Sequence, residues 1–302
     1  MSSARPAWTR LIRFEGADGQ VHMGEPEDAT LDVGRASRDG KPFSARLLEG
    51  SAPWDARPTG TRVDVKRLLC PLLPLEVNTI RCLGLNYVDH AREAGLPLPS
   101  VPTLFHKPRT ALAGPWPSAV RVPKCVQDEQ SDYEAELVIV IGQDCRDVPE
   151  DKALDYVLAY TAANDISARK AQFETSQWSR SKGFDTACPL GPCLVSAAAF
   201  GDPSSSGQRI RGRLNGREVQ SAPLSNLVFS VARAVAFISQ GTTLERGSII
   251  LTGTPAGVGT FFKPPVTLKH GDEFEVEISG GIGTLCNSIE YEHDASHRVS
   301  RL

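Results

Sequence analysis

The sequence has no long apolar run, no excess of one charge and no C-x-x-C pair. No segment approaches about eighteen consecutive apolar residues, and the N-terminus has no apolar core of a secretory signal, so neither a membrane span nor secretion is expected. The formal net charge is −3, from 33 basic and 36 acidic side chains, without a block of like charge. Neither a nucleic acid nor a membrane surface is therefore an expected partner.

Cysteine usage points to the compartment. The seven cysteines are scattered and odd in number, with no C-x-x-C pair, a pattern typical of a reduced intracellular environment in which thiols act as small apolar side chains. The C-terminal Ser300-Arg301-Leu302 resembles the S-K-L peroxisomal signal, with arginine as the central cation. We therefore expect an intracellular protein, either cytoplasmic or, if this weak three-residue signal is read, peroxisomal.

The composition is that of a globular chain with two parts. With 302 residues, 40% hydrophobic and 23% charged, the chain is long enough for one large core and a smaller domain. Residues 1–75 contain short alternating segments separated by the turn pairs Asp18-Gly19 and Asp39-Gly40, which predict a small β-rich N-terminal domain. Two prolines in 70–75 predict a linker, with the larger domain over 76–302.

The larger part is dominated by predicted strands. Short apolar segments between glycines and prolines predict strands at 80–84, 135–141, 158–163, 194–197, 249–251 and 273–278. Helices are predicted at 151–156, with acids in its first turn, and at 227–239, with an apolar stripe at helical spacing. A β-rich chain of this length favours a mixed α+β fold with a rolled or barrel-like sheet over a doubly wound one.

Two carboxylates lie at the start of the most apolar predicted strand. Glu134 and Glu136 are two residues apart, and because side chains alternate in an extended chain they face the same side. Asp165 follows the next apolar segment, and three carboxylates suffice for an Mg²⁺ or Mn²⁺ site with open positions. On this motif alone, the solvated face of a half-buried sheet is the commoner explanation.

A histidine and a glutamate share a second predicted helix. If residues 87–94 form a short helix ended by Gly95, His90 and Glu93 lie at i and i+3 on one face, where the carboxylate orients the imidazole as in a general base. Taken alone, such a pair is more often an ordinary exposed ion pair.

Two loop segments complete the set of candidate residues. Lys182, in 180–192, offers a point charge for a substrate carboxylate or a developing oxyanion, although a surface lysine is the commoner case. Residues 251–259 combine glycines with the hydroxyl of Thr254, a pattern of close backbone approach or simply of a turn that ends a strand. The spacing is not that of a phosphate-binding loop.

Six motifs occur in a characteristic order. They are G-L-N-Y-x-x-H-x-x-E-x-G, F-x-K-P, D-Y-E-x-E-L, N-D-x-x-A-R, K-G-F-D-T-x-C-P and L-T-G-T-P-x-G-V-G. In this order they resemble the fumarylacetoacetate hydrolase family, over roughly two thirds of the chain, from about Ile80 to about Cys286.

The resemblance implies a catalytic domain of mixed β-roll type, a homodimer and one bound Mg²⁺ or Mn²⁺. It also implies roles for particular residues: metal ligands Glu134, Glu136 and Asp165; a catalytic dyad of His90 and Glu93 on a mobile lid; the catalytic pocket lysine Lys182; and substrate-binding residues Thr254, Arg169 and Gln172. The expected partner is a small 2-oxo or β-dicarbonyl acid.

Such a site supports three reactions. A divalent ion can stabilise an enolate formed by hydrolysis of a C–C bond, by decarboxylation or by proton transfer alone. The His90 and Glu93 pair favours hydrolysis, because a positioned base activates water. Our leading hypothesis is a metal-dependent hydrolase of an acylpyruvate-like acid. The alternatives are a decarboxylase, tautomerase or isomerase of oxaloacetate-like acids, and a metal-binding module without catalysis.

Overall fold

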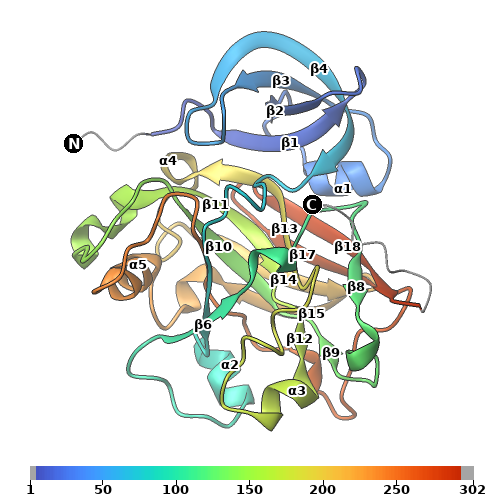
Figure 1. Cartoon of the computed structure of the whole chain (residues 1–302), viewed down its shortest axis with the longest axis vertical. Helices are drawn as coiled ribbons and strands as arrows, with labels where there is room; N and C mark the ends of the chain where they lie inside the picture. The colour runs from blue at the N-terminus through green and yellow to red at the C-terminus, as the bar shows by residue number, and fades with distance from the viewer. Residues whose placement is uncertain (1–4, 294–302) are drawn as a thin grey trace.

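The computed structural model describes residues 5–293, and β-strands dominate it (Figure 1). The predicted mixed α+β fold is confirmed. Ser300–Leu302, which carry the peroxisome-like signal, lie outside the described residues. Among the helices that the structure describes, none is long and apolar enough to cross a membrane.

Four N-terminal strands form a closed ring at one end of the molecule (Figure 1). They are β1 (Arg10–Gly16), β2 (Val21–Pro26), β3 (Ser44–Glu49) and β4 (Arg57–Leu69), with α1 (Val33–Arg38) between β2 and β3. β1 and β3 each pair with both β2 and β4. β1 also pairs with β13, so hydrogen bonds join the ring to the main sheet, and the division into 1–75 and 76–302 stays a prediction.

The central sheet continues from the ring in the order β1, β13, β11, β10, β16, β5 and β6. Its strands are β13 (Cys188–Ser196), β11 (Val157–Asn164), β10 (Ala135–Ile141), β16 (Ile249–Leu251), β5 (Ile80–Gly84) and β6 (Thr103–Lys107), and β7 (Leu112–Ala113) pairs with β13. Every residue of β10, β11 and β13 is buried, which explains their nearly continuous apolar sequences.

A second sheet of five strands and a small two-stranded sheet complete the β-structure. The five strands are β15 (Arg217–Pro223), β14 (Arg209–Leu214), β17 (Glu273–Ile278), β18 (Gly283–Tyr291) and β8 (Val120–Val122), and the small sheet contains β9 (Ser131–Asp132) and β12 (Ser167–Ala168). Tyr133, just before β10, stacks on Phe274 of β17 with ring centroids 4.4 Å apart, which ties the two sheets together.

The helices are short. Besides α1, they are α2 (Val88–Glu93), α3 (Arg169–Glu174), α4 (Ala197–Phe200) and α5 (Val231–Ser239), and the 3₁₀ segments are η1 (Arg109–Ala111), η2 (Lys124–Val126), η3 (Glu150–Tyr156), η4 (Leu224–Asn226) and η5 (Gly259–Phe261). α2 and α3 lie at the end of the molecule opposite the ring (Figure 1).

Three predicted elements differ from the structure. The helix predicted over 227–239 begins at Val231, because the Ser230 side chain accepts a hydrogen bond from Arg233 N and caps it there. The segment predicted as a helix over 151–156 is the 3₁₀ segment η3. The strand predicted over 194–197 is the end of β13, and its last residue, Ala197, already belongs to α4.

Candidate functional site

The three predicted metal ligands lie together at one end of β10. Glu134 directly precedes the strand and Glu136 lies within it, so both project to the same side. Asp165 follows β11, and its backbone N–H donates to Glu134 O at 2.9 Å. One carboxylate oxygen from each residue lies within 4.8 Å of the others, and all three residues are buried.

Buried cations pair with two of these acids. Lys182 Nζ lies 2.8 Å from both Glu134 Oε2 and Asp165 Oδ2. Arg169 Nη1 lies 2.7 Å from Glu134 Oε1. Burial alone would raise the pKa of Glu134, but the charges of Lys182 and Arg169 outweigh it and lower that pKa to about 2. The Glu134 carboxyl is therefore ionised.

Glu136 has a different environment. Its Oε2 accepts a 2.6 Å hydrogen bond from Gly253 N. Burial, together with the neighbouring charges of Asp165 and Glu134, raises the pKa of Glu136 well above its usual value. Negative charge at this position is thus poorly compensated by the protein.

The charges around the triad favour a bound cation. The buried acids of the triad and beside it are Asp132, Glu134, Glu136 and Asp165, and the buried cations that contact them are Lys107, Arg169 and Lys182. With every carboxyl ionised, four negative charges face three positive ones, and a divalent cation would turn this excess into a net positive charge. Mg²⁺ and Mn²⁺ both prefer carboxylate oxygens, so the residues present fit either ion, held by the triad.

Lys107 is a buried cation that our sequence analysis did not single out as a site residue. Its Nζ lies 2.7 Å from Asp165 Oδ1 and donates to the carbonyl oxygens of Ala187 (2.8 Å), Ile166 (3.3 Å) and Lys182. These contacts fix the loop that carries Lys182 against the end of β11. The signal for Lys107 was present in the F-x-K-P motif.

His90 faces the cavity from α2, and Glu93 of the same helix contacts His90. Gly95, with φ +67°, ends this helix, and Leu96 N donates back to Ala91 O. His90 Nδ1 lies 3.1 Å from Glu93 Oε2, while Glu93 Oε1 accepts from Gly257 N at 2.9 Å. A carboxylate only accepts hydrogen bonds, so Glu93 fixes the imidazole with Nδ1 as the donor, and in the neutral ring Nε2 is then an acceptor.

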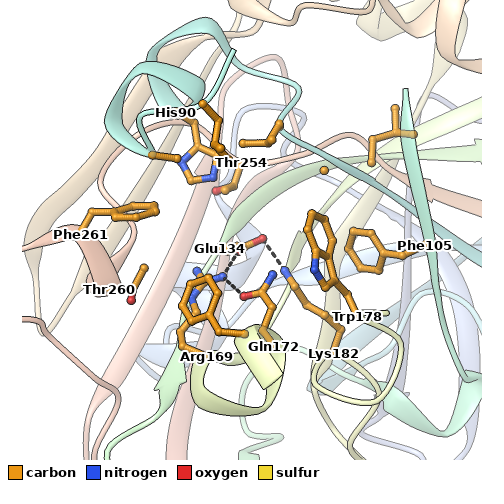
Figure 2. A pocket seen from close by; sticks show the side chains of 16 residues that line it. His90, Phe105, Glu134, Arg169, Gln172, Trp178, Lys182, Thr254, Thr260 and Phe261 are labelled. Carbon is orange, nitrogen blue, oxygen red and sulfur yellow. Dashed lines mark hydrogen bonds and ion pairs between the residues drawn. The ribbon is translucent and has the colours of Figure 1, made fainter. Parts of the chain in front are cut away.

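One cavity of about 100 Å³ lies between His90 and Glu134 (Figure 2). Six of the nine residues proposed from the sequence line it: His90, Glu134, Arg169, Gln172, Lys182 and Thr254. Arg169 Nη2 is buried and has no hydrogen-bond partner among the described residues, so it is a free donor. The Thr254 hydroxyl already donates to Ala135 O at 2.9 Å and accepts from Gln220 at 2.8 Å, so it has no hydrogen left for a ligand.

Asp132 holds two parts of the cavity together. Its Oδ2 lies 2.7 Å from Arg169 Nε, and its two oxygens accept from Gly259 N (2.8 Å) and Thr260 N (3.0 Å) of η5. Phe261, also in η5, lies with its ring centroid 6.0 Å from that of His90. The acid was visible in D-Y-E-x-E-L, but its partners are more than thirty residues away in sequence, so sequence spacing gave no sign of this role.

Comparison with known proteins gives the same family as the motifs. A family model described as "Fumarylacetoacetate (FAA) hydrolase C-terminal" matches residues 79–290. A caffeoylpyruvate hydrolase of Neonothopanus nambi is 47% identical over 301 residues, covering 97% of this chain and 96% of that protein.

Two further matches differ in their named activities. A mitochondrial oxaloacetate tautomerase of Xenopus laevis is 42% identical over 224 residues, covering 74% of this chain and 68% of that protein. The crystal structure of fumarylpyruvate hydrolase from Pseudomonas aeruginosa, in complex with Mn²⁺ and pyruvate, is 30% identical with a TM-score of 0.64, covering 75% of this chain and 93% of that chain.

Proposed function

The chain belongs to the fumarylacetoacetate hydrolase family, and from this premise we propose that it is an Mg²⁺- or Mn²⁺-dependent hydrolase of acylpyruvate-like acids. The observation that carries the proposal is the arrangement in Figure 2: the carboxylate-supported His90 faces, across one cavity, the buried Glu134 of the triad. A base near a cation-binding acid cluster is what the hydrolysis of a C–C bond next to a ketone requires.

The protein's own groups have distinct tasks in this proposal. His90 Nε2 takes a proton from a water molecule, which adds to the acyl carbonyl, and the bond between that carbonyl carbon and the CH₂ of the pyruvate moiety breaks. The acyl part leaves as a carboxylic acid, and the carbon released takes up a proton to give pyruvate. Arg169 Nη2 and Lys182 Nζ bind and orient the anionic end of the substrate. When bound, the divalent ion supplies Lewis-acid stabilisation of the developing negative charge.

The relatives support hydrolysis. Caffeoylpyruvate hydrolase and fumarylpyruvate hydrolase are both named as hydrolases of an acylpyruvate, and the second contains Mn²⁺ and pyruvate. The same family premise supports a homodimer, which light scattering of the purified chain would test.

Tautomerisation of an oxaloacetate-like acid is the second candidate. It is favoured by the oxaloacetate tautomerase of Xenopus laevis, which matches 74% of this chain. The same donors, Arg169 and Lys182, would hold such an acid, while His90 would move a proton between carbon and oxygen without adding water. Decarboxylation of the same acid remains a variant of this candidate.

Metal dependence and product identity test the proposal together. Purified protein incubated with Mn²⁺ and either acetylpyruvate or benzoylpyruvate is expected to yield pyruvate and the free acid, as followed by NMR, and EDTA is expected to abolish the reaction. Glu136→Gln should bind Mn²⁺ at least about tenfold more weakly in calorimetry, because the ion loses a charged ligand. Accelerated keto–enol exchange of oxaloacetate without cleavage of either acylpyruvate would favour the tautomerase, and no turnover at all would leave only a metal-binding module.

Asp132→Asn tests whether Arg169 must be held in place. Asparagine keeps one acceptor but places an NH₂ group toward Arg169 Nε and Thr260 N, both of which are donors. We expect KM to rise about tenfold with a smaller change in kcat, and the free energy of unfolding to fall by about 1–3 kcal/mol. Asp128→Asn, at an exposed ion pair with Lys170, is the matched control and should change neither. An unaltered KM in Asp132→Asn would contradict this role.

A further inference from the structure

The cavity combines a polar floor with an aromatic side. Figure 2 shows Arg169, Gln172 and Lys182 grouped at the floor, with Trp178 and Phe105 next to each other on one side and Phe261 on the other. We call Trp178 and Phe105 the aromatic wall. Lys182 Nζ lies 5.2 Å from the ring centroid of Phe105, so Phe105 already has a polar partner. The Trp178 ring has no such contact with a cation among the described residues, and another part of the ligand is left to explain it.

The Trp178 indole packs directly against the backbone of Gly84. Gly84, at the end of β5, lies so close to the indole that a Cβ atom there would be 2.5 Å from Cζ3 of Trp178. Trp178 also packs edge-on against Phe105, with ring centroids 5.5 Å apart and planes at 72°. Its carbonyl oxygen accepts from Lys182 N at 3.0 Å, so the indole and the catalytic-site lysine belong to one turn.

Apolar side chains also surround the mouth of the cavity. Leu96 is 50% exposed, Phe173 70% and Phe261 36%, and all three line the cavity. Exposed large apolar side chains that gather at a cavity mark a surface that a ligand or partner covers. A small acid with a carboxylate at each end would bring no apolar group to cover them.

We propose that the aromatic wall receives the acyl group of the substrate, and that this group is a flat, apolar one such as an aryl or arylvinyl group. The inference rests on the proposed function and names its substrate class. The anionic end of the acid lies at Arg169 and Lys182, and the planar acyl group stacks on the free side of the partly buried Trp178. Trp178 is thus a specificity-determining residue for this reaction.

The test is a ratio of two substrates. We compare kcat/KM for benzoylpyruvate with that for acetylpyruvate, both with Mn²⁺, and expect wild type to prefer the aromatic acid by at least about tenfold. Trp178→Ala should lower this ratio by about 10–100-fold, since a missing apolar contact in a pocket has effects of that size. Wild type that prefers acetylpyruvate, or a Trp178→Ala variant with an unchanged ratio, would overturn the inference.

Gly84→Ala provides a second variant that leaves Trp178 in the sequence. Its new methyl group meets the indole side chain first, and Gly84 has no left-handed backbone, so the change displaces Trp178 without straining β5. We expect the same direction of change in the ratio as in Trp178→Ala. Leu98→Ala removes an exposed apolar side chain that does not line the cavity and should leave the ratio at its wild-type value. An equal fall of the kcat/KM ratio in Leu98→Ala would show that the effect is not specific to the aromatic wall.

Binding of unreactive probes separates this inference from the proposed reaction. 2-Oxo-4-phenylbutanoate and 2-oxobutanoate lack the second ketone and cannot be cleaved, so calorimetry in Mn²⁺ measures their affinity whether or not the protein is a hydrolase. We expect the phenyl compound to bind at least about tenfold more tightly, and Trp178→Ala to remove the difference. If wild type binds the two probes with equal affinity, the inference is wrong even if both acylpyruvates are hydrolysed. A clear preference for the phenyl compound, without hydrolysis of either acylpyruvate, would support the role of the aromatic wall and contradict the proposed hydrolysis.

Discussion

Lys107→Met is expected to lower the free energy of unfolding by about 3–5 kcal/mol, among the largest losses for a single side chain in this protein. Lys107 and Asp165 have fully buried side chains, and the ammonium also donates to three backbone carbonyl oxygens. Methionine fills similar space but leaves Asp165 Oδ1 and those carbonyls without the Lys107 donor, while Asp165 Oδ2 keeps its contact with Lys182. Urea unfolding in EDTA, followed by circular dichroism, measures the loss without a contribution from bound metal.

The matched control for this prediction is Lys170→Met. Lys170 pairs with Asp128 at the surface, where both side chains are more than half exposed, so its removal should cost less than about 1 kcal/mol. Lys107→Met within about 1 kcal/mol of wild type would show that the buried contacts of Lys107 contribute little to stability. The order of the two variants is therefore as informative as the size of either loss.

The sequence predicted those parts of the site that depend on local geometry. The alternation of an extended chain places Glu134 and Glu136 on one side, and helical spacing places His90 and Glu93 within 3.1 Å of each other. Both relations span at most three residues, so the backbone period alone fixes them. The roles of these residues stay predictions until the variants are measured.

Long-range partners were not predictable in the same way. Lys107, at the end of β6, contacts Asp165, just after β11, across 58 positions, because both strands belong to the central sheet. Asp132 of β9 contacts Thr260 of η5 across 128 positions. The start of β13 was hidden for a different reason: Pro189 and Pro192 lie within it, and proline argues against a central strand. The motifs marked these residues as special, but only the fold shows what each of them contacts.

The charge arrangement explains why so many polar groups can be buried here. Each cation touches more than one acceptor, as Lys182 does with Glu134 and Asp165, and as Arg169 does with Asp132 and Glu134. Shared partners satisfy most buried groups and fix their positions, but leave a negative charge on Glu136 poorly compensated and Arg169 Nη2 without an acceptor among the described residues. In our proposal, a divalent cation compensates the charge of Glu136, and an anionic substrate accepts a hydrogen bond from Arg169 Nη2.

His90→Ala is expected to lower kcat by about 10²–10⁴-fold, the usual contribution of a positioned general base. Affinity for Mn²⁺ should stay near the wild-type value, because His90 lies on α2 and is not one of the three clustered acids. Glu93→Gln should have a smaller effect, because glutamine can still accept from Gly257 N but no longer stabilises a protonated imidazole. Steady-state rates with benzoylpyruvate and calorimetric titration with Mn²⁺ measure the two properties separately.

Unchanged turnover in His90→Ala would remove this residue from the mechanism, whereas a parallel loss of metal affinity would mean that it shapes the site as a whole. If the His90 imidazole takes the proton of the attacking water, His90→Ala should lose turnover but keep its affinity for Mn²⁺, and the kcat of Glu93→Gln should lie between those of His90→Ala and wild type.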